Sequence, residues 1–144
     1  MTTYYLNEAV FTLPDRGFID RTLHRLESPL AGEDPLAVEI RRLPMEEGKS
    51  LRQLVDDEVA ATKTKVNGFT VVEDSEVSLS GNGAPAIVLQ ARLRARDEVF
   101  LQRQAHVAFE ETWIALVVTA PRIAGAACDE TFEHILRSIE WRTA

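Results

Sequence analysis

The chain has 144 residues, a length that favours a single domain over residues 1–144. It carries 23 acidic against 16 basic residues, and the resulting charge of -7 disfavours nucleic-acid backbones and anionic membrane surfaces as partners. A hydrophobic fraction of 45% with only 7 Gly and 6 Pro excludes a disordered or fibrous chain. The composition is that of an ordinary globular domain.

A single cysteine, Cys128, excludes an internal disulfide framework and favours a reducing compartment. The first residues, Met1–Glu8, show no basic stretch followed by an apolar one. No window reaches the roughly 18 consecutive apolar residues that a membrane span needs. We therefore expect a cytoplasmic protein that does not insert stably into a membrane.

Three strands and a helix are expected in the first half of the chain. The strands cover residues 4–13, 18–26 and 36–43, where alternating or clustered apolar residues lie between turn residues. The helix covers Ser50–Val66, because its apolar residues recur at helical spacing. Ser50 and Gln53 have the capping-box pattern at its start, and Asn67–Gly68 supplies a left-handed stop at its end.

Four strands and a second helix are expected in the second half. The strands cover residues 69–79, 87–96, 99–109 and 113–120, and the short turns between them are typical of an antiparallel meander. Asp129 is positioned to cap a final helix with apolar residues at i, i+3, i+4 and i+7. The fold class is therefore α+β, with about seven mostly antiparallel strands, two helices, and at least one sheet face covered by helices.

No pattern of residues indicates an active site. The histidines His24, His106 and His134 lie in three separate elements, and none has zinc-ligand spacing. Cys128 precedes a helix, where a thiol pKa can fall, but the sequence shows no paired base, so a packing role is favoured. We therefore expect no enzyme activity, no metal and no cofactor.

One sheet face is expected to mix apolar groups with uncharged amides. The even positions of strand 99–109 include Phe100, Gln102 and Gln104, and we place Val88 and Gln90 of the neighbouring strand beside them. A surface that meets apolar side chains and also bonds a few polar groups has this composition. The competing interpretation is a partly exposed sheet with scattered glutamines.

The second and third strands complete the candidate partner-binding set. Thr22, His24 and Leu26 extend the same mixture on the second strand, and Val38 and Ile40 are the apolar positions of the third.

The N-terminal half carries a family resemblance. The residues that carry it are Tyr5-Leu-Asn-Glu8, Phe11-x-Leu-Pro14, Asp20-Arg-Thr22, the strand ending Ile40-Arg-Arg and the helix Leu51–Val66. The chain resembles the Eag family of small chaperones, which accompany type VI secretion effectors and belong to a larger PsbP-like and DcrB-like group. The resemblance runs from about Tyr4 to the final helix with its Ser138.

The resemblance implies a cytoplasmic homodimer with a curved, PsbP-like sheet that forms an apolar concave surface. That surface would hold the N-terminal transmembrane helices of an effector, next to its PAAR domain, and help load it onto the secretion spike. Gln90, Gln102 and Gln104 would then bond cargo backbone where small residues leave it accessible. Two alternatives are a carrier of small molecules or lipids using the same face and an enzyme built around Cys128 and a histidine.

Overall fold

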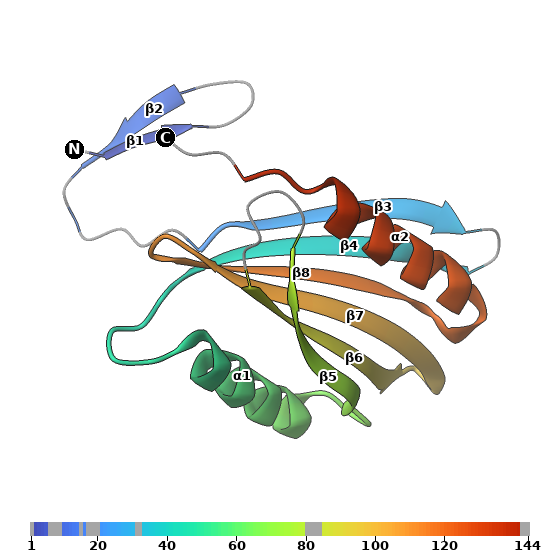
Figure 1. Ribbon diagram of the computed structural model, residues 1–144. Helices are drawn as coiled ribbons and strands as arrows, with labels where there is room; N and C mark the ends of the chain where they lie inside the picture. Colours follow the sequence, from blue (N-terminus) through green and yellow to red (C-terminus); the bar gives the residue numbers. More distant parts are fainter. Residues whose placement is uncertain are drawn as a thin grey trace.

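The computed structural model describes residues 2–5, 10–14, 16, 21–30, 33–79 and 85–141. Figure 1 shows these elements along the chain. In order they are β1 (Thr2–Tyr5), β2 (Val10–Leu13), β3 (Leu23–Leu30), β4 (Glu33–Pro44), α1 (Leu51–Lys65), β5 (Thr70–Ser78), β6 (Pro85–Ala95), β7 (Glu98–Phe109), β8 (Thr112–Pro121), a 3₁₀ turn (Arg122–Ala124) and α2 (Gly125–Ser138).

A six-stranded sheet forms the body of the molecule, with the strand order β3-β4-β8-β7-β6-β5 and antiparallel pairing throughout. The expected α+β class and the meander from β5 to β8 are confirmed. The first expected strand, residues 4–13, is instead two strands: β1 and β2 pair with each other, Thr2 opposite Leu13, in a separate two-stranded sheet. The segment folds back on itself, so the main sheet has one strand fewer than expected.

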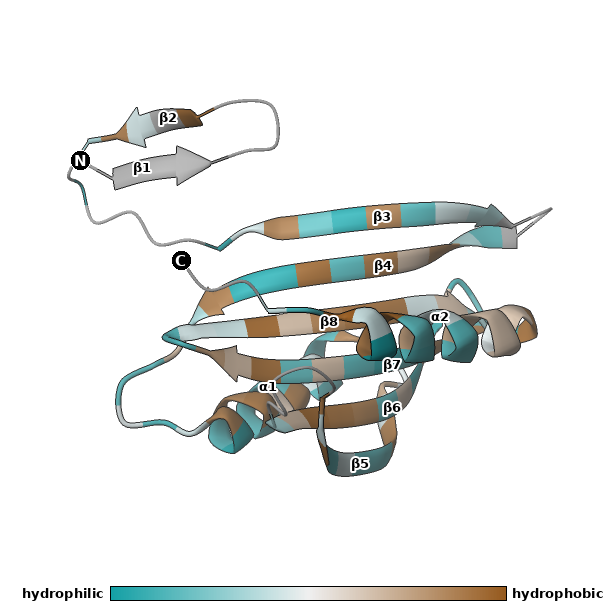
Figure 2. Ribbon diagram, turned by 45° about the horizontal axis from the view of Figure 1, so that its top comes forward, coloured by the Kyte–Doolittle hydropathy of each residue, from teal (hydrophilic) through white to brown (hydrophobic). Residues whose placement is uncertain are grey.

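The two helices cover opposite faces of this sheet (Figures 1 and 2). Phe132 and Cys128 of α2 pack on one face, against Leu116 and Val118 of β8. Leu54 and Val55 of α1 pack on the other, in a cluster with Leu89 of β6. Because side chains alternate along a strand, the sheet separates two cores. We call its two sides the α1 face and the α2 face.

The start of α1 follows from its sequence. The Ser50 side chain accepts a hydrogen bond from the backbone N–H of Gln53, and the Gln53 side chain accepts one from the backbone N–H of Ser50. Both bonds satisfy amides that a helix start leaves unpaired, as the capping-box pattern predicts. The helix ends at Lys65 with Val66 in an extended conformation, so the stop does not come from a left-handed cap as predicted. Gly68 adopts a φ of 66° in the turn that follows.

The start of α2 differs from its prediction. Asp129 lies inside the helix, which begins at Gly125 without a side-chain cap. The 3₁₀ turn Arg122–Ala124 leads directly into α2, so the chain enters the helix from an existing turn and the carboxylate is not needed as a cap. Asp129 instead accepts a hydrogen bond from Arg103 of β7 at 2.8 Å.

The packing of α2 on the sheet can be tested at Phe132, which is fully buried beneath the Arg103 guanidinium, 4.7 Å from the ring centroid. Phe132→Ala should lower the free energy of unfolding by about 3–5 kcal/mol. Ile123→Ala is the control, because this side chain is 80% exposed, and it should change stability by less than about 0.5 kcal/mol. Urea denaturation measures both, and equal losses would contradict this packing.

Candidate functional site

The candidate partner-binding residues do not share one face, contrary to the expectation from the sequence. The two-residue turn Arg96–Asp97 pairs Ala95 with Glu98, so Val88 lies opposite Ala105 and Gln90 opposite Arg103. Residues opposite each other in a ladder point to the same side. The even positions of β6 therefore lie on the α2 face, whereas the even positions of β7 lie on the α1 face.

Seven candidates lie on the α2 face: Thr22, His24, Leu26, Val38, Ile40, Val88 and Gln90. Val38, Ile40 and Val88 are partly buried and pack against the α2 core. His24 and Leu26 on the edge strand β3 are exposed. The structure therefore gives Val38, Ile40 and Val88 a packing role beneath α2.

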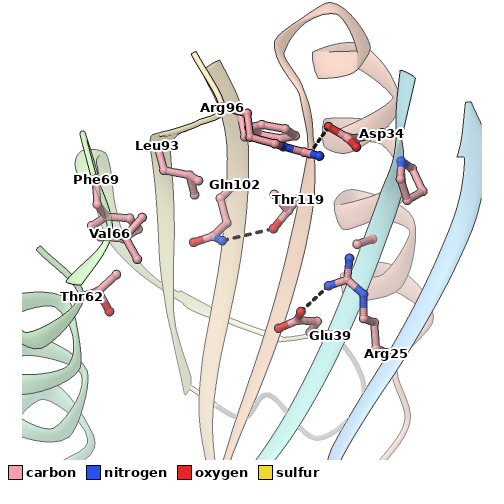
Figure 3. A pocket seen from close by; sticks show the side chains of 13 residues that line it. Arg25, Asp34, Glu39, Thr62, Val66, Phe69, Leu93, Arg96, Gln102 and Thr119 are labelled. Atoms are coloured by element: carbon pink, nitrogen blue, oxygen red, sulfur yellow. Dashed lines mark hydrogen bonds and ion pairs between the residues drawn. The ribbon is translucent and has the colours of Figure 1, made fainter. Parts of the chain in front are cut away.

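Phe100, Gln102 and Gln104 lie on the α1 face and line a groove between α1 and β4. The groove consists of two adjoining cavities of about 360 Å³ and 200 Å³, which share Glu39, Thr62, Phe69 and Gln102. Figure 3 shows the larger cavity, with Thr62, Val66, Phe69 and Leu93 on one side and Glu39 and Arg25 on the other. We call these two cavities together the α1 groove.

A chain of hydrogen bonds runs along the floor of the α1 groove. Trp113 Nε1 donates to His106 Nδ1 at 3.1 Å, and His106 Nε2 lies 2.8 Å from Gln104 Oε1. The Gln104 amide nitrogen donates to the Gln102 oxygen, and the Gln102 nitrogen donates to the Thr119 hydroxyl at 3.1 Å. Five side chains from β7 and β8 are thus held in one connected series.

The indole fixes the direction of this series. An indole N–H can only donate, so His106 Nδ1 must accept and His106 Nε2 must carry the proton that bonds Gln104. Burial lowers the pKa of His106 to about 4, with a further lowering from the nearby Arg41 and a smaller opposing effect of Asp74. The imidazole is neutral at pH 7, and it orients Gln104, which is only 9% exposed.

Charged side chains stand at the rim of the α1 groove, and the nearby carboxylates pair with them. Arg25 bonds Glu39, and Arg96 donates to Asp34 at 2.6 Å, as Figure 3 shows. Arg41 lies 3.6 Å from Glu58 beside the smaller cavity. The rim is therefore charged but locally compensated, and the floor presents apolar side chains and neutral amides.

The sequence interpretation missed several groove residues, namely Thr62, Val66, Phe69, Leu93 and Thr119. Thr62 and Val66 are four residues apart at the end of α1, so helical spacing places them on one side of the helix. That spacing was a signal for a helix face turned toward the sheet. Thr119 carried no comparable signal, because only the pairing of β8 with β7 brings it opposite Gln102.

Cys128 is buried in the α2 core, in agreement with the packing role that the sequence favoured. Burial is the main cause that raises the pKa of its thiol to about 11, so the thiol is protonated at neutral pH. In the ranges that the structure describes, no group of three or more His, Cys, Asp or Glu side chains could hold a metal ion. The described helices include none long and apolar enough to cross a membrane.

The arrangement defines an α+β fold of the PsbP-like type that carries an open groove on one sheet face. The DcrB family model matches residues 8–138 of the chain, and the protein therefore belongs to the DcrB family. No curated protein sequence matches this chain.

Two solved structures share this fold. The protein of unknown function PA94 from Pseudomonas aeruginosa has a TM-score of 0.83 at 16% identity, over 100% of this chain and 99% of that one. CyanoP, the cyanobacterial PsbP of Synechocystis sp. PCC 6803, has a TM-score of 0.56 at 10% identity, over 89% and 95%. At these identities, both structural similarities concern the fold alone.

The lowered pKa of His106 predicts a pH dependence of stability. In the folded state the imidazole stays neutral down to a pKa of about 4, whereas an unperturbed histidine has a pKa of 6.5. Its stabilising contribution is complete above pH 6.5 and is lost as the pH falls toward 4, because the unfolded chain binds the proton first. The loss between pH 7 and pH 4.5 should be about 2 kcal/mol.

Urea denaturation of the native protein and of His106→Gln at both pH values measures this loss. The variant retains a hydrogen-bonding amide but has no imidazole, so its unfolding free energy should fall by about 2 kcal/mol less over the same interval. Parallel pH profiles for the two proteins would contradict the neutral, buried His106.

Proposed function

We propose that the protein is an adaptor chaperone. It binds and shields the N-terminal transmembrane helices of a type VI secretion effector that carries a PAAR domain, and helps load that effector onto the secretion spike. It works in the cytoplasm as a homodimer. The observation that carries the proposal is the α1 groove, whose floor combines apolar side chains with the neutral amides of Gln102 and Gln104.

The chemistry of the groove suits the surface of a transmembrane helix. Such a helix is apolar over about 20 residues and is insoluble in water without cover. Where its residues are small, other groups approach its backbone closely, and polar side chains bond across such contacts in membranes. Phe100 and Leu93 supply apolar area in the groove, and the Gln102 amide supplies a polar group beside them.

The charge distribution supports the same reading. A buried charge facing an apolar helix costs free energy unless it is paired. Arg25 is paired with Glu39 and Arg96 with Asp34 at the rim, so neither guanidinium would face the cargo as an unpaired charge. An apolar segment can therefore lie on the floor between these pairs.

The size of the groove supports a dimer. A helix of 20 residues is about 30 Å long and about 10 Å wide, which amounts to roughly 2,400 Å³. The cavities of one protomer, about 360 Å³ and 200 Å³, accommodate only part of such a helix. Two protomers offer two grooves and so cover more of the cargo surface.

A carrier of small molecules or lipids is the alternative function. The larger cavity, at about 360 Å³, falls within the range of roughly 300–1,000 Å³ typical of small-molecule sites. The two functions differ in what copurifies. A chaperone retains a protein with apolar N-terminal helices, whereas a carrier retains an extractable small molecule and is indifferent to those helices.

Coexpression tests the proposal directly. The partner is an effector, encoded near this protein, that has N-terminal transmembrane helices next to a PAAR domain. The tagged chaperone should retain the full effector and should lose it when the apolar N-terminus is deleted. Equal retention of both forms, or retention of neither, would contradict the proposed function.

Gln102→Ala should weaken effector binding by roughly 1–3 kcal/mol, because it removes a bond to a cargo group that has no water to replace it. This corresponds to a roughly 5- to 150-fold change in Kd. Gln90→Ala is the matched control: it removes the same amide from a half-buried position on the α2 face and should leave binding unchanged. Titration of the purified variants against the effector N-terminus measures both constants, and thermal melting checks the fold. A larger loss for Gln90→Ala would place the cargo on the α2 face.

A further inference from the structure

The outer edge of β3 is open for pairing. Among the described residues, β3 has a neighbouring strand on one side only, β4 (Figure 2). Leu23 and Leu26 are 56% and 62% exposed. An exposed edge strand is a template for pairing with another chain unless the sequence protects it.

The backbone bonding shows which groups point outward. The N–H of Arg42 bonds the C=O of Thr22, so the even residues of β3 face β4. In agreement, the N–H of Met45 bonds Glu111, so the odd residues of β4 face β8. The odd residues of β3 therefore present their N–H and C=O groups to the free edge. Pro29 lies at the irregularity of the β3–β4 pairing, between Ser28 and Leu30, and has no N–H to donate, so the regular free edge covers Leu23–Glu27.

The opposite edge of the sheet differs from β3 in its charge. Both edge strands have one irregularity in their pairing, between Val71 and Glu73 on β5 and between Ser28 and Leu30 on β3, so a bulge does not distinguish them. The β5 strand carries the acidic residues Glu73, Asp74 and Glu76 and no basic residue. A second β5 would bring carboxylates near carboxylates, so β5 is unsuited to pairing with itself.

We propose that a second copy of this chain pairs along β3, antiparallel, with Arg25 opposite Glu27 of the partner subunit. A two-fold axis then passes between Leu26 and Leu26 of the partner subunit. Within one chain Arg25 already bonds Glu27 and Glu39. In this register each Arg25 also faces Glu27 of the partner subunit, so opposite charges meet twice across the axis. The outward N–H groups of Arg25 and Glu27 find carbonyl partners in Glu27 of the partner subunit and Arg25 of the partner subunit.

Neighbouring registers are unfavourable. A shift of two residues one way sets Arg25 opposite Arg25 of the partner subunit, and a shift the other way sets Glu27 opposite Glu27 of the partner subunit. Like charges directly opposite each other destabilise a sheet. Shifts of one residue align outward-facing groups with inward-facing ones and break the ladder. The alternation of Arg25 and Glu27 thus selects one register.

This pairing places both α1 grooves on the same side of a continuous sheet. Residues opposite each other share a face, so Arg25 of one protomer and Glu27 of the partner subunit both lie on the α1 face. Arg25 also lines the groove rim. The inference rests on the homodimer within the proposed function and gives that dimer its contact surface.

Cysteine cross-linking tests the register without any effector, so its failure is distinct from failure of the proposed function. Leu26→Cys should form an intermolecular disulfide under mild oxidation, because directly opposed residues of a non-hydrogen-bonded pair have Cα atoms about 4.5 Å apart. Leu23→Cys is the matched control, since it is similarly exposed. Its partner copy would lie about six residues along the strand, roughly 20 Å away, so it should stay monomeric on a non-reducing gel.

A charge exchange provides the second test. Arg25→Glu and Glu27→Arg should each weaken self-association at least tenfold, because each puts like charges opposite each other. An equimolar mixture should form heterodimers, since all facing charges are then opposite. Native mass spectrometry and light scattering measure these species, with melting curves as the check of folding.

Three results would overturn the pairing: a 16 kDa species as the sole form of the native protein at tens of micromolar, disulfides from Leu23→Cys as readily as from Leu26→Cys, or no heterodimer in the mixture.

Discussion

The turn at Arg96–Asp97 decides which side chains of the sheet meet. Both residues have positive φ, 51° and 63°, as a two-residue hairpin with the twist of its strands requires. This turn joins β6 and β7 directly and fixes their register from Ala95 opposite Glu98 onward. As a result Gln102 and Gln104 lie with Leu89 on the α1 face, and Gln90 lies with Ala105 on the α2 face.

Local patterns in the sequence located α1 and the strands from β5 to β8, but they did not specify which face of the sheet each side chain occupies. The capping box at Ser50 depends on a few neighbouring residues, so it could be predicted. The face that the odd or even residues of a strand occupy depends on the length and type of the turn before that strand. An error of one residue moves all of its side chains to the other face. The interpretation that placed Val88 beside Phe100 made this error, although each strand was correctly located.

The groove depended on longer-range information. Phe100, Gln102 and Gln104 were identified because their alternation lies within one strand. The opposing wall comes from α1, about forty residues earlier in the chain, and from β4 beside β8. No local pattern specifies that Thr62 faces Gln102. The rim pairs also join segments distant in sequence: Arg96 and Asp34 are 62 positions apart.

The bond from Trp113 to His106 determines what the groove offers a ligand. Since the indole supplies the first donor, the orientation of each amide out to Thr119 follows from a residue in the protein interior. Gln102 and Gln104 therefore cannot exchange their donor and acceptor ends freely, as exposed glutamines do. The groove is preorganised, because its donors and acceptors already have fixed positions before a ligand binds. Selectivity among apolar partners then depends on whether their exposed carbonyls and amides match this fixed arrangement of donors and acceptors.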